Sequence, residues 1–173
     1  MVRWGVVGAL LALVLTGCAS DKTGTEYLAI SQKVGPPRPG QSRIVVMSEK
    51  AMGLSAAGCD LSVDGNAVGK VKPGTYVYAD RPAGKHQMVA TQTLFPGDTK
   101  RELTTESGRT YFFQIKNSER TNAITGVALV GGLAGALVAS AATSGKDNPG
   151  PVDFIPLDEA TAQTTLANLQ LSD

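Results

Sequence analysis

Apolar and polar residues alternate in short segments between residues 42 and 116, and turn residues separate these segments. In one of them, Cys59, Leu61 and Val63 share one face of an extended chain. Strands are expected at residues 43–47, 59–63, 67–71, 75–79, 86–91, 101–105 and 110–115. No long helical pattern interrupts them, so antiparallel pairing is the simplest arrangement. The pattern predicts a mainly β fold, an antiparallel β-sandwich of about seven strands.

Residues 121–145 break this pattern, because they include no charged residue across 25 positions. Residues 123–142 form a 20-residue apolar stretch whose length fits a bilayer span. Gly131 and Gly135 are four positions apart, and Gly132 belongs to a second row of small residues at the same spacing. Small residues at this spacing let helix backbones approach closely. The segment is therefore expected to be a glycine-zipper helix with Gly131, Gly135 and Gly132 as helix-contact residues.

Three placements of this helix remain open from the sequence, and a flexible apolar loop is the alternative to a helix. It could contact a membrane, it could contact a helix of a second copy, or it could pack on the open face of the sandwich. Its seven large aliphatic side chains would favour insertion by about −2 to −4 kcal/mol near the centre of a span. The glycines, Thr125 and Ser140 offset part of this gain, so insertion is marginal.

The N-terminus has the order of a targeting segment: Arg3 supplies one positive charge, and an apolar run from Trp4 to Leu15 follows. The next residues, Leu15-Thr16-Gly17-Cys18, resemble a bacterial lipobox. The resemblance implies that residues 1–17 are a signal peptide and that Cys18 becomes a lipid-modified first residue. Several acyl chains on one residue give stable membrane attachment.

The residue after Cys18 bears on the location of the protein. An Asp directly after the cysteine resembles an inner-membrane retention signal, whereas this chain has Ala19. The expected location is therefore the cell envelope, lipid-anchored at the outer membrane and facing the periplasm. Asp21, two places further on, weakens this assignment without reversing it.

The chain divides into five expected parts. A signal peptide at 1–17 is followed by a lipid anchor and Pro-rich tether at 18–41. The β-sandwich occupies 42–116 and the apolar glycine-zipper segment 117–145. Residues 146–173 are expected to form a loop and a short C-terminal helix, for which Asp158 is a suitable N-cap.

The strand turns carry four motifs in order, Val63-Asp64-Gly65, Val68-Gly69, Gly74-Thr75-Tyr76 and Pro82-Ala83-Gly84-Lys85-His86. In this order they resemble a bacterial lipoprotein family, domain of unknown function twenty-eight forty-six, and are similar to PEGA-type β-sandwich repeats. The resemblance covers roughly residues 33–116. Its motifs mark turns and strand edges, so it implies a fold and a binding or structural role in the cell envelope. It carries over no catalytic residue.

Composition narrows the function further. The 173 residues include 16 Lys+Arg and 15 Asp+Glu, a formal net charge of +1, which argues against nucleic-acid binding by phosphate neutralisation. One His and two Cys leave almost no material for a zinc or iron–sulfur site, and no acidic cluster suits calcium. No metal and no cofactor are expected.

Few residues could support catalysis. His86 has no neighbouring Ser or Cys and is expected to be an ordinary strand residue. Cys59 lies on an apolar face and is expected to be a small buried hydrophobe; a reactive thiol or an intermolecular disulfide is the alternative. Five aromatic residues could form a sugar-stacking platform or be divided between core and surface: Tyr76, Tyr78, Tyr111, Phe112 and Phe113. We expect no enzymatic activity.

These observations predict a lipid-anchored cell-envelope module with a non-enzymatic binding or structural role. The alternative is a membrane-active or self-assembling lipoprotein that acts through its glycine-zipper segment. The expected partners are the membrane, through the lipid anchor, and an envelope protein, a glycan or a second copy of the chain.

Overall fold

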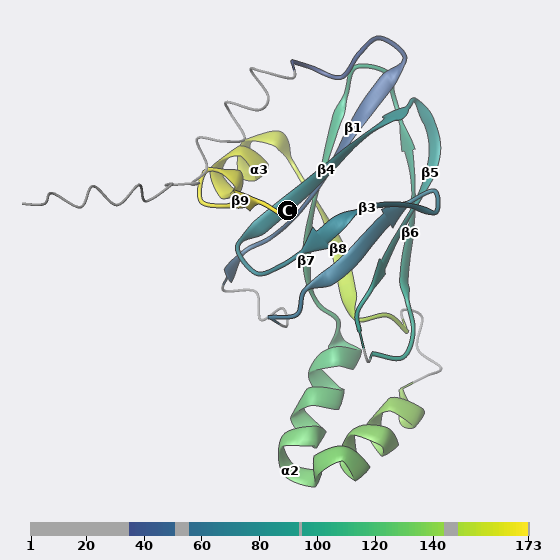
Figure 1. Cartoon of the computed structure of the whole chain (residues 1–173), viewed down its shortest axis with the longest axis vertical. Coiled ribbons are helices and arrows are strands. Elements are labelled where there is room, and N and C mark those ends of the chain that lie inside the picture. The colour runs from purple at the N-terminus through teal and green to yellow at the C-terminus, as the bar shows by residue number, and fades with distance from the viewer. Residues whose placement is uncertain (1–34, 51–55, 94, 144–148, 173) are drawn as a thin grey trace, which may run out of the picture.

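The protein is a two-layer β-sandwich with a helical projection at one end (Figure 1). The structure is a computed structural model that describes residues 35–50, 56–93, 95–143 and 149–172. One sheet has five strands in the order β8 (Val152–Leu157), β7 (Thr110–Asn117), β1 (Gln41–Ser48), β4 (Thr75–Pro82) and β9 (Gln170–Leu171). The other has four, in the order β3 (Asn66–Val71), β2 (Cys59–Val63), β5 (Gly84–Thr91) and β6 (Thr99–Thr105).

The seven expected strands are all present, as β1 to β7, and several extend by one to three residues beyond their expected ends. The mainly β sandwich is thus confirmed. Two strand pairs are parallel, β1 with β7 and β4 with β9, while the other pairs are antiparallel. The parallel pairs join segments far apart in the chain, which local alternation does not reveal.

The sandwich also takes two strands from residues 146–173, where the sequence predicts only a loop and a helix. The first, β8, alternates buried and less buried residues and pairs with β7 at the edge of the five-stranded sheet. Pro156 lies within it, which is tolerated because proline is compatible with an edge strand. The second, β9, has only two residues, too few to produce a periodic pattern.

Strand β1 is buried on both of its faces. Ile44 and Val46 join the core between the sheets, whereas Val45 and Met47 belong to a second core on the outer face of the five-stranded sheet. Helix α3 (Glu159–Leu166) covers that outer face with Leu166. The short C-terminal helix is thus confirmed, and it ends at Leu166 rather than Asn168.

Asp158 is the N-cap of α3, as the sequence predicts. Its Oδ1 accepts a hydrogen bond of 2.9 Å from the backbone N–H of Thr161. The amide N–H and the hydroxyl of Thr161 both donate to this carboxylate, and the two hydrogen bonds lower the pKa of Asp158.

Edge strands of the two sheets are joined close to the helical projection. The Thr99 hydroxyl of β6 donates a 2.6 Å hydrogen bond to the carbonyl oxygen of Val152 in β8. Arg101 of β6 donates from Nη1 to the carbonyl oxygen of Phe154 at 2.9 Å. This corner gives the projection a fixed base.

Candidate functional site

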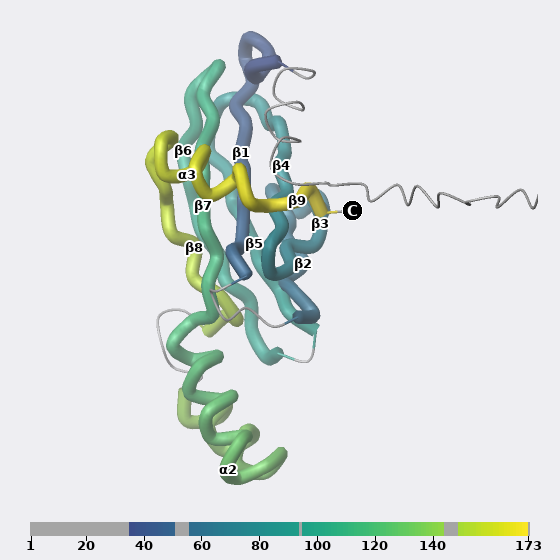
Figure 2. Tube along the Cα trace, turned by 90° about the vertical axis from the view of Figure 1, so that its left-hand side faces the viewer, coloured from purple at the N-terminus to yellow at the C-terminus, as the bar shows by residue number. Residues whose placement is uncertain are grey.

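Helix α2 (Glu119–Ala142) is a bent hairpin that extends beyond the ends of the strands (Figures 1 and 2). It begins after Ser118, whose side chain accepts a hydrogen bond from the backbone N–H of Thr121 at 3.2 Å. At Gly132 the helical geometry breaks, with φ 60° and ψ −155°. The chain turns there, and the second arm runs back toward the sandwich.

The expectation of one continuous helix is therefore wrong. A non-glycine residue rarely adopts the conformation of Gly132, so glycine at this position permits the bend. The bend places Gly131 and Gly135 on different arms rather than on one helix face.

The other two predicted contact glycines differ in their surroundings. A Cβ atom added to Gly135 would lie 3.1 Å from both the carbonyl oxygen and Cγ1 of Val127, so this glycine lets the two arms approach closely. A Cβ on Gly131 would lie 4.0 Å from Val127 Cγ1, an ordinary contact distance. Gly132 and Gly135 thus serve the hairpin itself, and Gly131 leaves space on its surface.

Arg120 holds the two ends of the hairpin together. Its side chain is buried, with an exposed fraction of 3%. Nε donates to Thr143 Oγ1 at 3.1 Å, and Nη2 donates to the carbonyl oxygen and the hydroxyl of Ser140 at 3.3 and 3.2 Å. The first turn of α2 is therefore bonded to its last turn.

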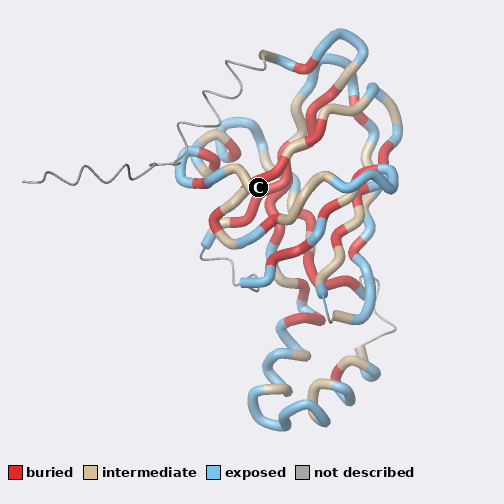
Figure 3. The backbone as a smooth tube through the Cα atoms, viewed as in Figure 1, coloured by how far each residue is buried: buried red, intermediate tan, exposed pale blue. Residues whose placement is uncertain are grey.

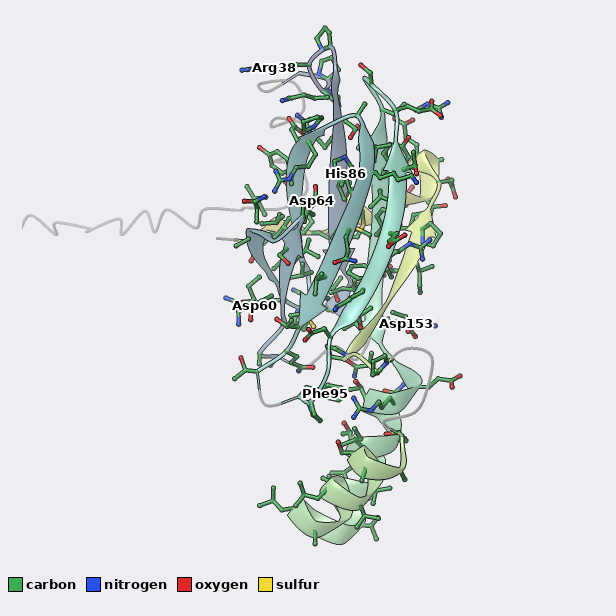
Figure 4. All side chains as sticks on the ribbon, turned by 90° about the vertical axis from the view of Figure 1, so that its right-hand side faces the viewer. Arg38, Asp60, Asp64, His86, Phe95 and Asp153 are labelled. Carbon is green, nitrogen blue, oxygen red and sulfur yellow. The ribbon has the colours of Figure 1, made fainter. Side chains whose placement is uncertain are left out.

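The same guanidinium group also fixes the hairpin to two loops of the sandwich. Arg120 Nη1 donates to the carbonyl oxygen of Pro96 at 2.5 Å and to that of Pro149. Phe95 lies near the base of the hairpin (Figure 4). The guanidinium carbon of Arg120 lies 5.0 Å from the centre of the Phe95 ring, a cation–π geometry. Arg120 was not among the residues predicted from the sequence, although a charged residue directly before a long charge-free segment was an available signal.

Most residues on both arms of the hairpin are exposed (Figure 3), and six of them are large aliphatic residues. The exposed fractions are 43% for Val127, 84% for Leu129, 93% for Val130, 86% for Leu133, 70% for Leu137 and 70% for Val138. The buried residues of α2 are Arg120, Thr121 and Ala139, and all three belong to its first and last turns. The expected alternative of packing on the open face of the sandwich is therefore wrong for most of the segment.

By length and composition, α2 is the one helix in the described part of the chain that could cross a membrane. Because of the bend at Gly132, however, this length is not that of one continuous helix. A span needs about 20 consecutive apolar residues in one helix. The arms on either side of Gly132 are each shorter than that.

His86 and Asp64 form a close pair on the four-stranded sheet (Figure 4). His86 Nδ1 lies 2.6 Å from Asp64 Oδ2, and Nε2 lies 2.7 Å from the carbonyl oxygen of Pro82. The backbone N–H of Gln87 donates to Asp64 Oδ1 at 2.9 Å, and this bond with that of His86 holds the pKa of Asp64 below its ordinary value. Both ring nitrogens face oxygen acceptors, and the pair joins the turn after β2 to strand β5.

Cys59 is fully buried in the core between the sheets, as its alternation pattern predicts. Burial, with a smaller contribution from the charge of Asp60, raises the pKa of its thiol to about 11. A thiol that stays protonated is a poor nucleophile.

The aromatic residues form no common platform. Phe113 lies in the core between the sheets, whereas Phe112 and Tyr76 lie in the core under α3. Tyr78 lies under the guanidinium of Arg43, 5.2 Å from ring centre to guanidinium carbon. Tyr111 packs against the core between the sheets, so the five residues are divided between two cores rather than between core and surface, and the sugar-stacking alternative is not supported.

In the described ranges no group of three or more His, Cys, Asp or Glu side chains could hold a metal ion. The predicted signal peptide, the lipidation site Cys18 and most of the tether lie outside the described residues. The last part of the tether is described. Its Gly35 accepts a hydrogen bond of 3.1 Å at the carbonyl oxygen from Nη1 of Arg43 in β1.

Comparison with known proteins places the chain in a family. The model of a family described as "Protein of unknown function (DUF2846)" matches residues 38–132, more than half of the chain. The chain belongs to this family. The DUF2846 match runs through β1 to β7 and ends at the Gly132 bend, so it includes the first arm of the hairpin. No curated protein matches the chain.

Proposed function

We propose that this DUF2846 protein is a lipid-anchored, non-enzymatic module of the cell envelope and that the α2 hairpin is its contact element. The observation that carries the proposal is the exposure of six large aliphatic side chains on a projection that stands clear of the sandwich. Contiguous exposed apolar surface on a protein commonly marks an interaction site.

The hairpin is held in place before it meets any partner. Arg120 bonds its two ends to each other and to the loops at Pro96 and Pro149. A contact element fixed in advance loses less conformational entropy on binding. The tie therefore supports a binding or structural role.

The proposed lipid anchor is Cys18, and the proposed location is the outer membrane facing the periplasm. Arg38, near the start of the described chain, lies at the end of the sandwich opposite α2 (Figure 4). A strand of eight residues such as β1 is about 27 Å long, whereas the 17 residues 18–34 could extend to about 55 Å or more. The anchor and the hairpin could therefore reach the same membrane.

Two side chains support a role without catalysis. Both ring nitrogens of His86 already face oxygen acceptors, and the Cys59 thiol is buried with a raised pKa. Neither side chain offers a group suited to general-base or nucleophilic chemistry.

Self-assembly through the hairpin is the second candidate. A Cβ atom on Gly126 would meet no atom within 4 Å, and Gly131 has similar space. Both glycines are exposed, so a helix of a second copy could approach the first arm closely.

An in-cell crosslinking experiment tests the proposed contact element. A photoreactive residue is placed at Leu133 on the hairpin or, as a matched control, at the exposed Thr104 of β6. The proposal predicts adducts with envelope components at position 133 and none at position 104. Adducts between two copies would establish the second candidate, and absence of any adduct at position 133 would contradict both.

The anchor is tested separately by mass spectrometry of the mature protein. The mass should show acyl groups on Cys18 and loss of residues 1–17, and Cys18→Ser should abolish membrane fractionation. An unmodified Cys18 in the mature protein would show that the anchor proposal is wrong.

A further inference from the structure

We infer that the α2 hairpin inserts its tip into one leaflet of a lipid bilayer and leaves by the same side. The inference rests on the proposed function, because it names the partner of the proposed contact element. The partner is a lipid surface, and the inserting side chains are the six exposed aliphatic residues between Val127 and Val138.

The distribution of these side chains favours lipid over a folded partner. The apolar residues of α2 do not gather on one helix face. The three most exposed, Leu129, Val130 and Leu133, flank the bend. A protein groove covers one side of a helix, whereas a bilayer surrounds an inserted helix on all sides.

The length of the arms fits one leaflet. Residues 123–131 of the first arm rise about 13 Å and residues 133–142 of the second about 15 Å. Half of a hydrocarbon core that is about 30 Å thick is about 15 Å. The bend at Gly132 would therefore lie near the middle of the bilayer while both ends stay at one surface.

The polar groups of the hairpin are concentrated at its base. Arg120 is buried there, and its hydrogen bonds go to Thr143, Ser140, Pro96 and Pro149. The Thr143 hydroxyl donates to the carbonyl oxygen of Ala139 at 2.7 Å. Because residues 121–145 carry no charge, insertion of the tip brings no ionised side chain into the hydrocarbon.

A second copy of the chain accounts for this surface less well. Packing through the space at Gly126 or at Gly131 would cover one flank of the first arm. Leu137 and Val138 of the second arm, each 70% exposed, would need further cover. A lipid leaflet covers both arms together.

The test uses the full chain reconstituted with phosphatidylcholine vesicles. An environment-sensitive fluorophore is attached to Leu133→Cys, and separately to Glu119→Cys at the base and Ser107→Cys at the far turn. Cys59 is buried, so we expect it to take no label in the folded protein. Emission at position 133 should shift to the blue and be quenched by spin labels on the lipid acyl chains, whereas the other two positions should show neither effect.

Two further measurements decide between the possible outcomes. An impermeant thiol reagent added outside should modify both Glu119→Cys and Ala142→Cys, because the hairpin leaves by the side it enters. The pair Val130→Asp with Leu137→Asp should abolish the blue shift of a label at 133. The matched pair Thr104→Asp with Ser107→Asp, which adds equal charge to exposed positions on the sandwich, should retain it.

Water-like emission at position 133 in the presence of vesicles would overturn the inference. If the thiol reagent modifies only one of positions 119 and 142, the segment is a spanning helix instead. A blue shift at position 133 without quenching by the lipid spin labels would show self-association. A second fluorophore on Cys18, read from the mass of the labelled chain, would contradict the proposed lipid anchor. In that case the emission of the label at position 133 is read in a Cys18→Ser background, so that failure of the anchor and failure of insertion remain distinguishable.

Discussion

Arg120 and Ser140, twenty positions apart in the sequence, are joined by two hydrogen bonds from one guanidinium nitrogen. Nη2 of Arg120 donates to the carbonyl oxygen of Ser140 at 3.3 Å and to its hydroxyl at 3.2 Å. The pair closes the base of α2 and converts an apolar segment of span-like length into a hairpin. The exposed residues therefore lie on a projection whose two ends are bonded to each other.

Replacing Arg120 should weaken this base. Arg120→Met removes the hydrogen bonds of a buried guanidinium group to the carbonyl oxygens of Pro96 and Pro149, and hydrogen bonds to a charged group contribute about 1.5–3 kcal/mol. We expect the free energy of unfolding in urea to fall by about this amount. Arg109→Met, at an exposed arginine paired with Glu106, should change it by less than about 0.5 kcal/mol. Equal effects of the two substitutions would contradict the role assigned to Arg120.

The bend should depend on glycine at position 132 and not at position 131. Gly132→Ala forces a side chain into a left-handed backbone conformation, at a cost of about 1–3 kcal/mol. Hydrogen exchange of the α2 amides should therefore speed up in this variant. Gly131→Ala has room for its methyl group and replaces a poor helix former, so exchange should be unchanged or slower. The reverse order would show that the bend lies elsewhere.

The fold was largely predictable because the residues that mark each of its main strands lie within one short segment of the sequence. Alternation such as that of Cys59, Leu61 and Val63, with turns such as Asp64-Gly65, located β1 to β7. Strand β8 was missed because it contains Pro156, and β9 because two residues hold no pattern. The parallel pairing of β1 with β7 depends on contacts between distant segments.

The site was predictable only in part. The absence of charge from residues 121–145 located the apolar segment, but Gly131 and Gly135 have a spacing that suits a straight helix as well as a bent one. The closure of the two ends depends on where Arg120 is held. That in turn depends on the carbonyl groups of Pro96 and Pro149, which lie 24 and 29 positions away in the chain.

Acid should weaken the contribution of Asp64. Its pKa is lowered in the folded protein, so the ionised carboxylate stabilises the fold above its unfolded pKa of about 3.9, and this stabilisation is lost as the pH falls through the folded value. Asp64→Asn keeps a residue that tolerates the positive φ of 52° but cannot ionise. The stability difference between the two proteins should shrink from about pH 5 to about pH 2. A difference that stays constant over this range would contradict the assignment.

The thiol of Cys59 should react slowly in the folded protein. It is fully buried, and its pKa is raised to about 11, so both access and thiolate formation are limited. A thiol-reactive label should modify it only as fast as the domain unfolds, and the rate should rise sharply in denaturant. Labelling in buffer as fast as in denaturant would show an exposed thiol and reopen a reactive role.

The account depends on α2 being a closed hairpin, and one distance tests this directly. Spin labels at Glu119→Cys and Ala142→Cys in the full chain report the separation of its two ends by pulsed electron resonance. Because Arg120 bonds to Ser140 and Thr143, we expect a short separation between the two labels. Arg120→Met should broaden the distribution of distances. A straight helix would place these positions about 35 Å apart, and that distance would contradict the account.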